Sequence, residues 1–228
     1  MDDDGRPLRY AYLHGFASSP KATKGVALAK AFRDRGHDFE LPDLNQPAFE
    51  GLSHDACLGA LDAMHRNRAA DDGARWCLIG SSLGGWLAAR WAEMHPARVE
   101  RLVLLCPGFD LRDRWPAMLG SEKMAKWGSE GELYMPDASG VYAPVHYGFY
   151  IESLRQPGRP SVPCPTLIIH GTRDETVPIE TSRSYVADHP GIELIEVDDD
   201  HRLGASIDRI TWEALSFFGL VDPAIDGA

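Results

Sequence analysis

Serine, aspartate and histidine side chains follow apolar segments of this sequence at positions where they could form a catalytic set. Residues 76–85 read Trp-Cys-Leu-Ile-Gly-Ser-Ser-Leu-Gly-Gly, so an apolar run passes directly into a G-x-S-x-G pentapeptide. A serine between a strand and a helix sits on a tight turn, and the flanking glycines let neighbouring backbone pass close by. The helix N-terminus beneath it adds partial positive charge, which favours an oxyanion. We therefore interpret Ser82 as a nucleophile; Ser81 should point away from the site. The alternative is a Gly/Ser-rich turn that only connects the two elements.

A nucleophilic serine requires a base, and the base requires an acid that orients it. Asp174 lies in the segment His-Gly-Thr-Arg-Asp-Glu-Thr-Val-Pro, just past the apolar run 166–170. His201 follows three aspartates after the apolar run 192–197. The chain order serine, aspartate, histidine is an order in which this triad occurs. The sequence therefore predicts a Ser82–His201–Asp174 triad.

Other interpretations of these positions remain open. Asp174 could be a turn-forming residue that bonds its own backbone, and His201 could be a solvated loop histidine. Asp110, which follows the apolar run 102–106, is a rival acid. We favour Asp174 because its loop should neighbour that of His201. His14 and His170 also end apolar runs, each before a glycine, and are interpreted as structural.

Short apolar runs alternate with stretches of helical period along the chain, which is typical of a parallel sheet covered by helices on both faces. The predicted strands are residues 9–13, 38–41, 76–79, 102–106, 166–170 and 192–197. The predicted helices are residues 24–35, 54–68, 83–94, 180–188 and 205–218. The pattern predicts an α/β fold in three layers, with a mostly parallel sheet of about six strands.

One segment, residues 110–165, carries aromatic residues, Gly and Pro without a clean period. A segment of this length in a compact domain is usually functional or disordered, and its aromatic content disfavours disorder. We interpret it as an inserted cap, with a hairpin that pairs residues 132–135 and 141–146 across a turn at 137–140. The predicted substrate-binding residues of this cap are Trp115, Trp127 and Tyr147. The alternative is that its aromatic residues pack among themselves or form a homodimer contact.

Composition limits the class of protein. The chain has 228 residues, 44% of them hydrophobic, and a net charge of −11, which indicates one soluble globular domain, residues 1–228, without a disulfide or metal staple. This negative charge argues against nucleic acid or an anionic membrane as the main partner. The four cysteines lack C-x-x-C spacing, and no metal site is expected. The N-terminus lacks the pattern of a secretory signal, so we expect a cytoplasmic protein.

A further segment near the start, Leu-His-Gly-Phe-Ala-Ser-Ser-Pro at residues 13–20, follows the first predicted strand. Together with Gly-Ser-Ser-Leu-Gly-Gly it resembles the α/β-hydrolase fold superfamily, and more closely the small bacterial serine esterases of uncharacterised families. The resemblance covers residues from about 9 to 220. It implies hydrolysis of ester or thioester bonds through an acyl-enzyme, with backbone N–H groups of Phe16 and Leu83 as the oxyanion hole.

The resemblance leaves the reaction partly open. It implies a small-molecule acyl ester as substrate and no cofactor. Another hydrolase on the same scaffold, such as a thioesterase, peptidase, lactonase or carbon–carbon bond hydrolase, would use the same three residues. From a different class, the chain could be a non-catalytic binding module, but the catalytic set is intact.

Overall fold

A six-stranded sheet forms the centre of the protein, and each pair of neighbouring strands in it is parallel. The computed structural model describes residues 4–69 and 72–221. The first three residues of the N-terminal segment, which lacks the sequence pattern of a secretory signal, lie outside the described residues. The strand order is β2-β1-β3-β4-β7-β8. These strands are β1 (Leu8–Leu13), β2 (Phe39–Glu40), β3 (Arg75–Ser81), β4 (Val99–Leu105), β7 (Thr166–Gly171) and β8 (Glu193–Val197).

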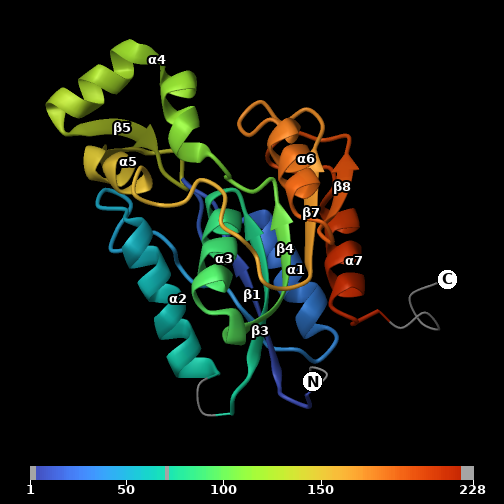
Figure 1. The fold of residues 1–228 in the computed structure, drawn as a ribbon. Helices are drawn as coiled ribbons and strands as arrows, with labels where there is room; N and C mark the ends of the chain where they lie inside the picture. Colours follow the sequence, from blue (N-terminus) through green and yellow to red (C-terminus); the bar gives the residue numbers. More distant parts are fainter. Residues whose placement is uncertain (1–3, 70–71, 222–228) are drawn as a thin grey trace.

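Helices cover both faces of this sheet (Figure 1). Buried side chains of α1 (Thr23–Arg33) and α7 (Ile207–Phe217) pack on one face. Buried side chains of α2 (His54–Arg68), α3 (Leu83–Met94) and α6 (Ile179–Asp188) pack on the other. This three-layer arrangement confirms the predicted fold class, because strands buried on both faces read as continuous apolar runs.

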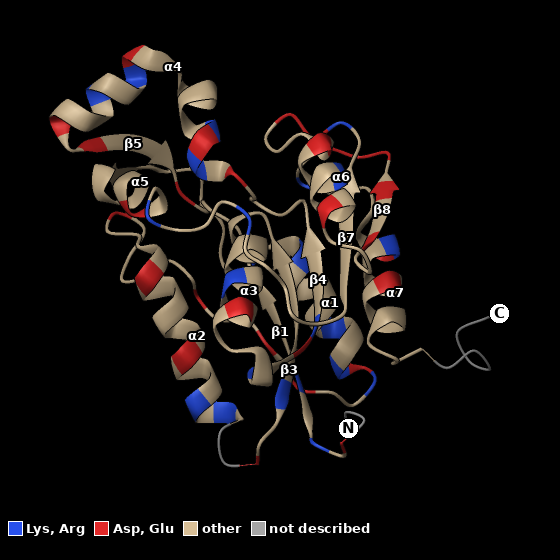
Figure 2. Cartoon of the chain, viewed as in Figure 1, with Lys and Arg blue, Asp and Glu red and all other residues tan. Residues whose placement is uncertain are grey.

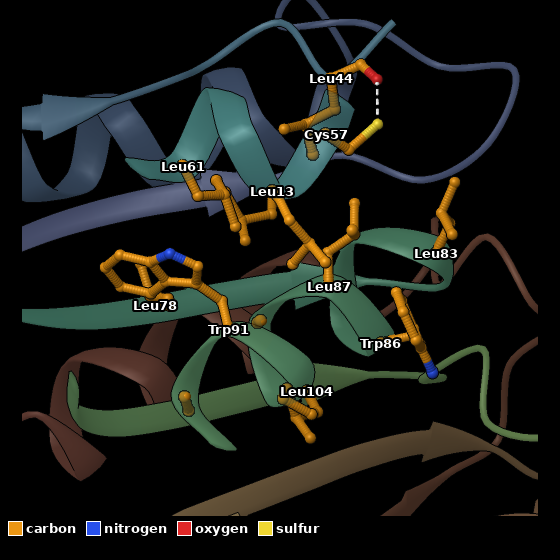
Figure 3. Close-up of a cluster of buried hydrophobic side chains, with 14 of the residues drawn as sticks. Leu13, Leu44, Cys57, Leu61, Leu78, Leu83, Trp86, Leu87, Trp91 and Leu104 are labelled. Carbon is orange, nitrogen blue, oxygen red and sulfur yellow. Dashed lines mark hydrogen bonds between the residues drawn. The ribbon is translucent and has the colours of Figure 1, made fainter. Parts of the chain in front are cut away.

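One apolar cluster contains side chains of the sheet, of α2 and of α3, and it includes Leu83, the residue after Ser82. Figure 3 shows α3 lying against the sheet, with Leu87 and Trp91 among the side chains of Leu13, Leu61 and Leu78. The Cys57 thiol, at the edge of this cluster, donates to the Leu44 carbonyl oxygen at 2.9 Å. Helix α3 is therefore fixed by apolar burial along its length, and the turn that precedes it has a rigid base.

The chain between β4 and β7 forms a separate group of elements, which we call the cap segment (residues 111–153). It consists of α4 (Leu111–Glu130), the antiparallel hairpin of β5 (Glu132–Pro136) and β6 (Tyr142–His146), and α5 (Tyr147–Ser153). Figure 1 shows these elements beyond the end of the sheet to which the arrowhead of β4 points. The predicted hairpin is present, with Asp137 Oδ1 accepting from the backbone N–H groups of Ser139 and Val141 in its turn.

The sequence pattern does not predict helix α4, and the reason lies in the middle of that helix. Gly120 has φ 79° and ψ 162°, so two helical pieces meet there at a kink. Each piece buries a single tryptophan, Trp115 or Trp127, and no apolar stripe runs the full length. Since periodicity is the main helical signal in a sequence, an interrupted helix of this kind reads as irregular.

Glu152 of α5 fastens the cap segment to the core. Its two carboxylate oxygens accept from the backbone N–H groups of His54 and Asp55 at 2.9 and 2.8 Å, and from the Ser53 hydroxyl at 3.0 Å. Burial by itself would raise the pKa of Glu152, but the His54 side chain and these hydrogen bonds outweigh burial and lower the pKa to about 2. An anion at the N-terminus of α2 is favourable, because free N–H groups point at it.

Charged side chains are spread over the outside of the molecule. Figure 2 shows Asp and Glu on α2, α4, α6 and α7, with Lys and Arg between them. The net charge of −11 is thus distributed among these helices and the loops.

Candidate active site

Ser82 lies on a strained turn between β3 and α3. Its backbone has φ 53° and ψ −118°, a conformation that L residues rarely adopt. A Cβ at Gly80 would stand 2.4 Å from the carbonyl oxygen of Gly84, and a Cβ at Gly84 would stand 2.1 Å from that of Leu13. The backbone approaches so closely in this sharp turn that only glycine fits at either position.

Backbone hydrogen bonds from three segments hold this turn. The Ser82 N–H donates to Leu105 O at 2.9 Å, and the Ser82 carbonyl accepts from Trp86 N at 3.1 Å and from Gly108 N at 2.9 Å. The Ser81 side chain is buried and hydrogen-bonds Tyr12, which belongs to the core on the α1 side of the sheet. Ser81 thus points away from Ser82, as expected.

His201 links Ser82 to Asp174. Its Nε2 lies 3.0 Å from Ser82 Oγ, and its Nδ1 lies 2.7 Å from Asp174 Oδ2. Because an ionised carboxylate only accepts, Nδ1 carries the proton and Nε2 is free to accept from the serine hydroxyl. The structure therefore brings together three side chains that are 119 and 27 residues apart along the chain.

Hydrogen bonds fix the loop that carries His201. The Asp199 carboxylate accepts from the backbone N–H of Asp200 and the hydroxyl of Ser206, each at 2.8 Å. The Lys24 ammonium on α1 donates to the Arg202 carbonyl oxygen at 2.6 Å. These contacts fix the backbone on both sides of His201 and limit the positions its ring can take.

Asp174 has no exposed side-chain surface and is surrounded by N–H donors. Its Oδ1 accepts from the backbone N–H groups of Thr176 and Val177 at 2.9 and 2.8 Å. Burial would raise the pKa of Asp174, but hydrogen bonds from His170 and His201 outweigh burial and hold the pKa well below its usual value. The carboxylate is therefore ionised at neutral pH.

The rival acid, Asp110, is engaged elsewhere. Its Oδ2 accepts from Arg159 Nε at 2.5 Å, and its backbone N–H donates to Gly158 O. Asp110 helps to anchor the segment between α5 and β7, and within the described residues its carboxylate pairs with Arg159 and not with His201. Geometry thus favours Asp174 as the acid.

Phe16 and Leu83, the predicted oxyanion donors, lie in the segments that flank Ser82. Leu83 is the first residue of α3, and a Cβ at Gly15 would lie 3.2 Å from Ser82 Cβ, so the loop after β1 passes against Ser82. Within residues 4–69 and 72–221, neither the Phe16 nor the Leu83 N–H donates to a protein acceptor. Two such donors beside a nucleophilic serine are what an oxyanion hole requires.

A cavity opens beside Leu83, between the core and the cap segment. The empty space between its walls is about 300 Å³, part of it open solvent, and only about 20 Å³ of that space has room for the centre of a water molecule. Its apolar wall includes Trp86 of α3, Trp115 of α4 and Leu111, and its polar groups include His54 and Arg112. The cavity is thus close to the backbone that would hold an oxyanion, and its wall is mainly apolar.

A sequence profile of an uncharacterised protein family, UPF0227, matches residues 9–219. The chain belongs to this family. A curated pimeloyl-[acyl-carrier protein] methyl ester esterase of Nitrosomonas europaea is 37% identical over 46% of this chain and 40% of its own length. The mitochondrial palmitoyl-protein thioesterase ABHD10 of Homo sapiens is 28% identical over 90% of this chain and 70% of its own length. The structure of mouse alpha/beta hydrolase domain-containing protein 10 superimposes with a TM-score of 0.71 at 25% identity, covering 93% of this chain and 90% of that one. The resemblance to the α/β-hydrolase fold is thereby confirmed.

Of the three aromatic residues predicted to bind substrate, only Trp115 lines the cavity of this UPF0227 member. Trp127 is fully buried within the cap segment, where its Nε1 donates to Val145 O at 2.8 Å. Tyr147 packs edge-on against Trp127 with a ring separation of 5.6 Å. Trp127 and the half-buried Tyr147 thus pack against each other away from this cavity, and a part for them in substrate binding stays a prediction.

His54 and Trp86 also line the cavity, although neither stands out in the sequence as a site residue. Each lies in the first turn of a helix, α2 or α3. Helices that follow strands of a parallel sheet begin near its carboxyl edge, where sites of this fold lie. First-turn residues of predicted helices were therefore the available signal.

Among the described residues, one group has the spacing of metal ligands. The ligand atoms of Cys106, His170 and Asp174 lie within 4.8 Å of one another. The Asp174 oxygens already accept N–H donors, and both His170 nitrogens have protein partners.

In the part of the chain that the structure describes, no helix is both long enough and apolar enough to cross a membrane.

Proposed function

We propose that this protein is a serine hydrolase that cleaves carboxylic ester or thioester bonds of acyl substrates. The observation that carries the proposal is the continuous hydrogen-bonded chain from Ser82 Oγ through His201 to Asp174, with distances of 3.0 and 2.7 Å. In such an arrangement a histidine can accept the proton of the serine hydroxyl, and the weakly nucleophilic hydroxyl becomes a stronger nucleophile.

In the first half-reaction, His201 Nε2 takes the Ser82 proton as Oγ attacks the acyl carbonyl carbon. The carbonyl oxygen gains negative charge and accepts from the backbone N–H groups of Phe16 and Leu83. The bond to the leaving oxygen or sulfur then breaks, and His201 returns the proton to the leaving group. Ionised Asp174 stabilises the imidazolium in between and holds the ring in place.

In the second half-reaction, water replaces Ser82 as the nucleophile. His201 takes a proton from the water, and the oxygen attacks the acyl carbon of the ester formed on Ser82. The bond to Oγ breaks, and the proton passes to Ser82, which regenerates the enzyme and releases a carboxylic acid. No other group is required for the proton balance.

The names of two relatives support both an alcohol and a thiol as leaving group. The Nitrosomonas europaea relative is named a methyl ester esterase, and the human relative a thioesterase. Both reactions pass through attack on an acyl carbonyl, so the site described above serves either. The cavity lined by Trp86 and Trp115 would hold an apolar part of the substrate.

Labelling with a fluorophosphonate tests the proposal without knowledge of the natural substrate. We expect one phosphonyl group on the wild-type protein, located on the peptide that contains Ser82, and none on Ser82→Ala. Ser81→Ala, which removes the adjacent hydroxyl, is the matched control and should label like the wild type. An unlabelled wild-type protein, or a label on Ser81, would contradict the proposal.

A further inference from the structure

His170 is a buried histidine that the mechanism above does not use. It lies in β7 and has no exposed surface. Its Nδ1 lies 2.7 Å from Ser182 Oγ, and its Nε2 lies 2.8 Å from Val177 O. Since a carbonyl oxygen only accepts, Nε2 carries the hydrogen, and the Ser182 hydroxyl donates to Nδ1. The ring is thereby fixed in one tautomer and one orientation.

The Nε2–H of His170 also faces the candidate acid. Nε2 lies 3.2 Å from Asp174 Oδ2, the same oxygen that accepts from His201 Nδ1. The hydrogen is thus shared between Val177 O and Asp174 Oδ2. Together with the two backbone donors on Oδ1, it fixes both carboxylate oxygens, and a rotation of the Asp174 side chain would break several of these bonds.

We infer that His170 is a positioning residue, which holds the Asp174 carboxylate in place for His201 and weakens the attraction of that carboxylate for a proton on His201. The inference rests on the proposed function of Ser82, His201 and Asp174. The pathway runs from Ser182 on α6 through His170 on β7 to Asp174: the first step is a hydrogen bond of 2.7 Å, the second is the 3.2 Å approach of His170 Nε2 to the Asp174 carboxylate, and none of the three side chains has exposed surface.

His170 also changes how strongly the negative charge on Asp174 acts on His201. A hydrogen bond from His170 spreads that charge, and it contributes to the lowered pKa of Asp174. Without it, Asp174 would stabilise the protonated form of His201 more strongly. Because only unprotonated His201 can accept the Ser82 proton, the acid limb of the reaction would move to higher pH.

Other titratable groups also face this pair. The Lys24 ammonium and the Cys106 thiol interact with Asp174, and Glu196 of β8 interacts with His170. Burial raises the pKa of Cys106, so its thiol is neutral at the pH of interest. Burial lowers the pKa of Lys24, although nearby carboxylates, Asp174 among them, oppose this. Substitutions at His170 leave all three in place, so they isolate the contribution of the imidazole.

The test measures the rate of Ser82 labelling by a fluorophosphonate from pH 4 to 10. His170→Met removes the donor and keeps an apolar side chain of similar length. His170→Gln keeps an N–H donor that can reach the position of Nε2. We expect roughly tenfold or slower labelling for His170→Met at neutral pH, since a hydrogen bond to a charged group is lost. Its acid limb should shift upward by roughly half a unit or more, and His170→Gln should recover most of the rate and the limb.

Two further variants keep the inference testable if His170→Met does not fold. Ser182→Ala removes the hydroxyl that fixes the ring and should slow labelling by roughly two- to fivefold. Tyr185→Phe removes another buried hydrogen bond of α6, from the Tyr185 hydroxyl to Pro160 O at 2.6 Å, and should label at the wild-type rate.

The inference is overturned if His170→Met and His170→Gln lose the same rate with an unchanged acid limb, since His170 would then only fill space. Wild-type rates for His170→Met or Ser182→Ala would also overturn it. An unlabelled wild-type protein would instead count against the proposed function, so the two failures are distinguishable.

Discussion

At the residue scale, the positions of single side chains account for the chemistry. Ser82 is held at φ 53° by glycines that no other residue can replace without a clash. Asp174 is buried yet ionised, because backbone and histidine donors surround it. A carboxylate in this state orients His201 without competing for its proton, which is the division of labour expected of a triad.

Replacing the acid distinguishes the two candidate aspartates. Asp174→Asn should lower kcat by up to roughly 10⁴, since the amide can donate to His201 and favour the wrong tautomer. Asp110→Asn should change kcat less than roughly fivefold, because Asp110 pairs with Arg159 and has no contact with His201. Steady-state kinetics on an activated ester measures both. A larger loss for Asp110→Asn would move the acid to the loop after β4.

The sequence predicted these catalytic candidates because each is a chemically distinctive residue at the end of an apolar run. It could not rank the pocket residues in the same way. Trp115 and Trp127 look alike in the sequence, yet one lines the cavity and the other donates to Val145 O inside the cap segment. Only the fold of α4 decides which tryptophan faces the core.

At the level of helices and strands, one carboxylate, that of Glu152, joins the cap segment to α2. Glu152 of α5 receives two backbone N–H groups of the first turn of α2, so the cap segment and a core helix depend on the same carboxylate. The pKa of Glu152 is lowered from its usual value to about 2. The folded state therefore favours the ionised form.

Glu152→Gln should lower the free energy of unfolding by about 1–2 kcal/mol at neutral pH, since charge-assisted bonds become neutral ones. This stability is present above the unfolded pKa near 4.5 and is lost as pH falls toward the folded value of about 2. The variant and the wild type should accordingly converge near pH 2 in denaturant titrations. Glu130→Gln, an exposed position on α4, is the control and should match the wild type. An equal difference between Glu152→Gln and the wild type at every pH would contradict this role.

The two tryptophans of α4 should respond differently to truncation. Trp115→Ala should enlarge the cavity and shift the preferred acyl chain to greater length, because each extra buried methylene is worth about 0.8 kcal/mol. Trp127→Ala should cost about 3–5 kcal/mol of stability, since it leaves a hole in the cap segment. Met118→Ala, at an exposed position of α4, is the control for both. A panel of acyl esters together with thermal unfolding checks the pair; an unchanged chain-length profile for Trp115→Ala would remove Trp115 from the substrate pocket.

At the scale of the whole molecule, the predictable part is the sheet with its helices. The bounds of all six strands and of the five helices that cover them agree with the predicted bounds within a few residues. A strand that is buried on both faces consists mostly of consecutive apolar residues, and such a run can be recognised in the sequence. The cap segment was less predictable. Its longest helix is interrupted at Gly120 and buries few residues, so it lacks the period that identifies a helix.

The proposed mechanism requires that acyl esters be cleaved through a covalent intermediate on Ser82. Acid quenching of a reaction with an activated ester, followed by mass spectrometry of the peptides, detects this intermediate. We predict one acyl group on the Ser82 peptide of the wild-type protein and of Ser81→Ala, and none on Ser82→Ala, which should lose nearly all turnover. An acyl group on Ser81 or Cys106, or undiminished turnover by Ser82→Ala, would contradict the account.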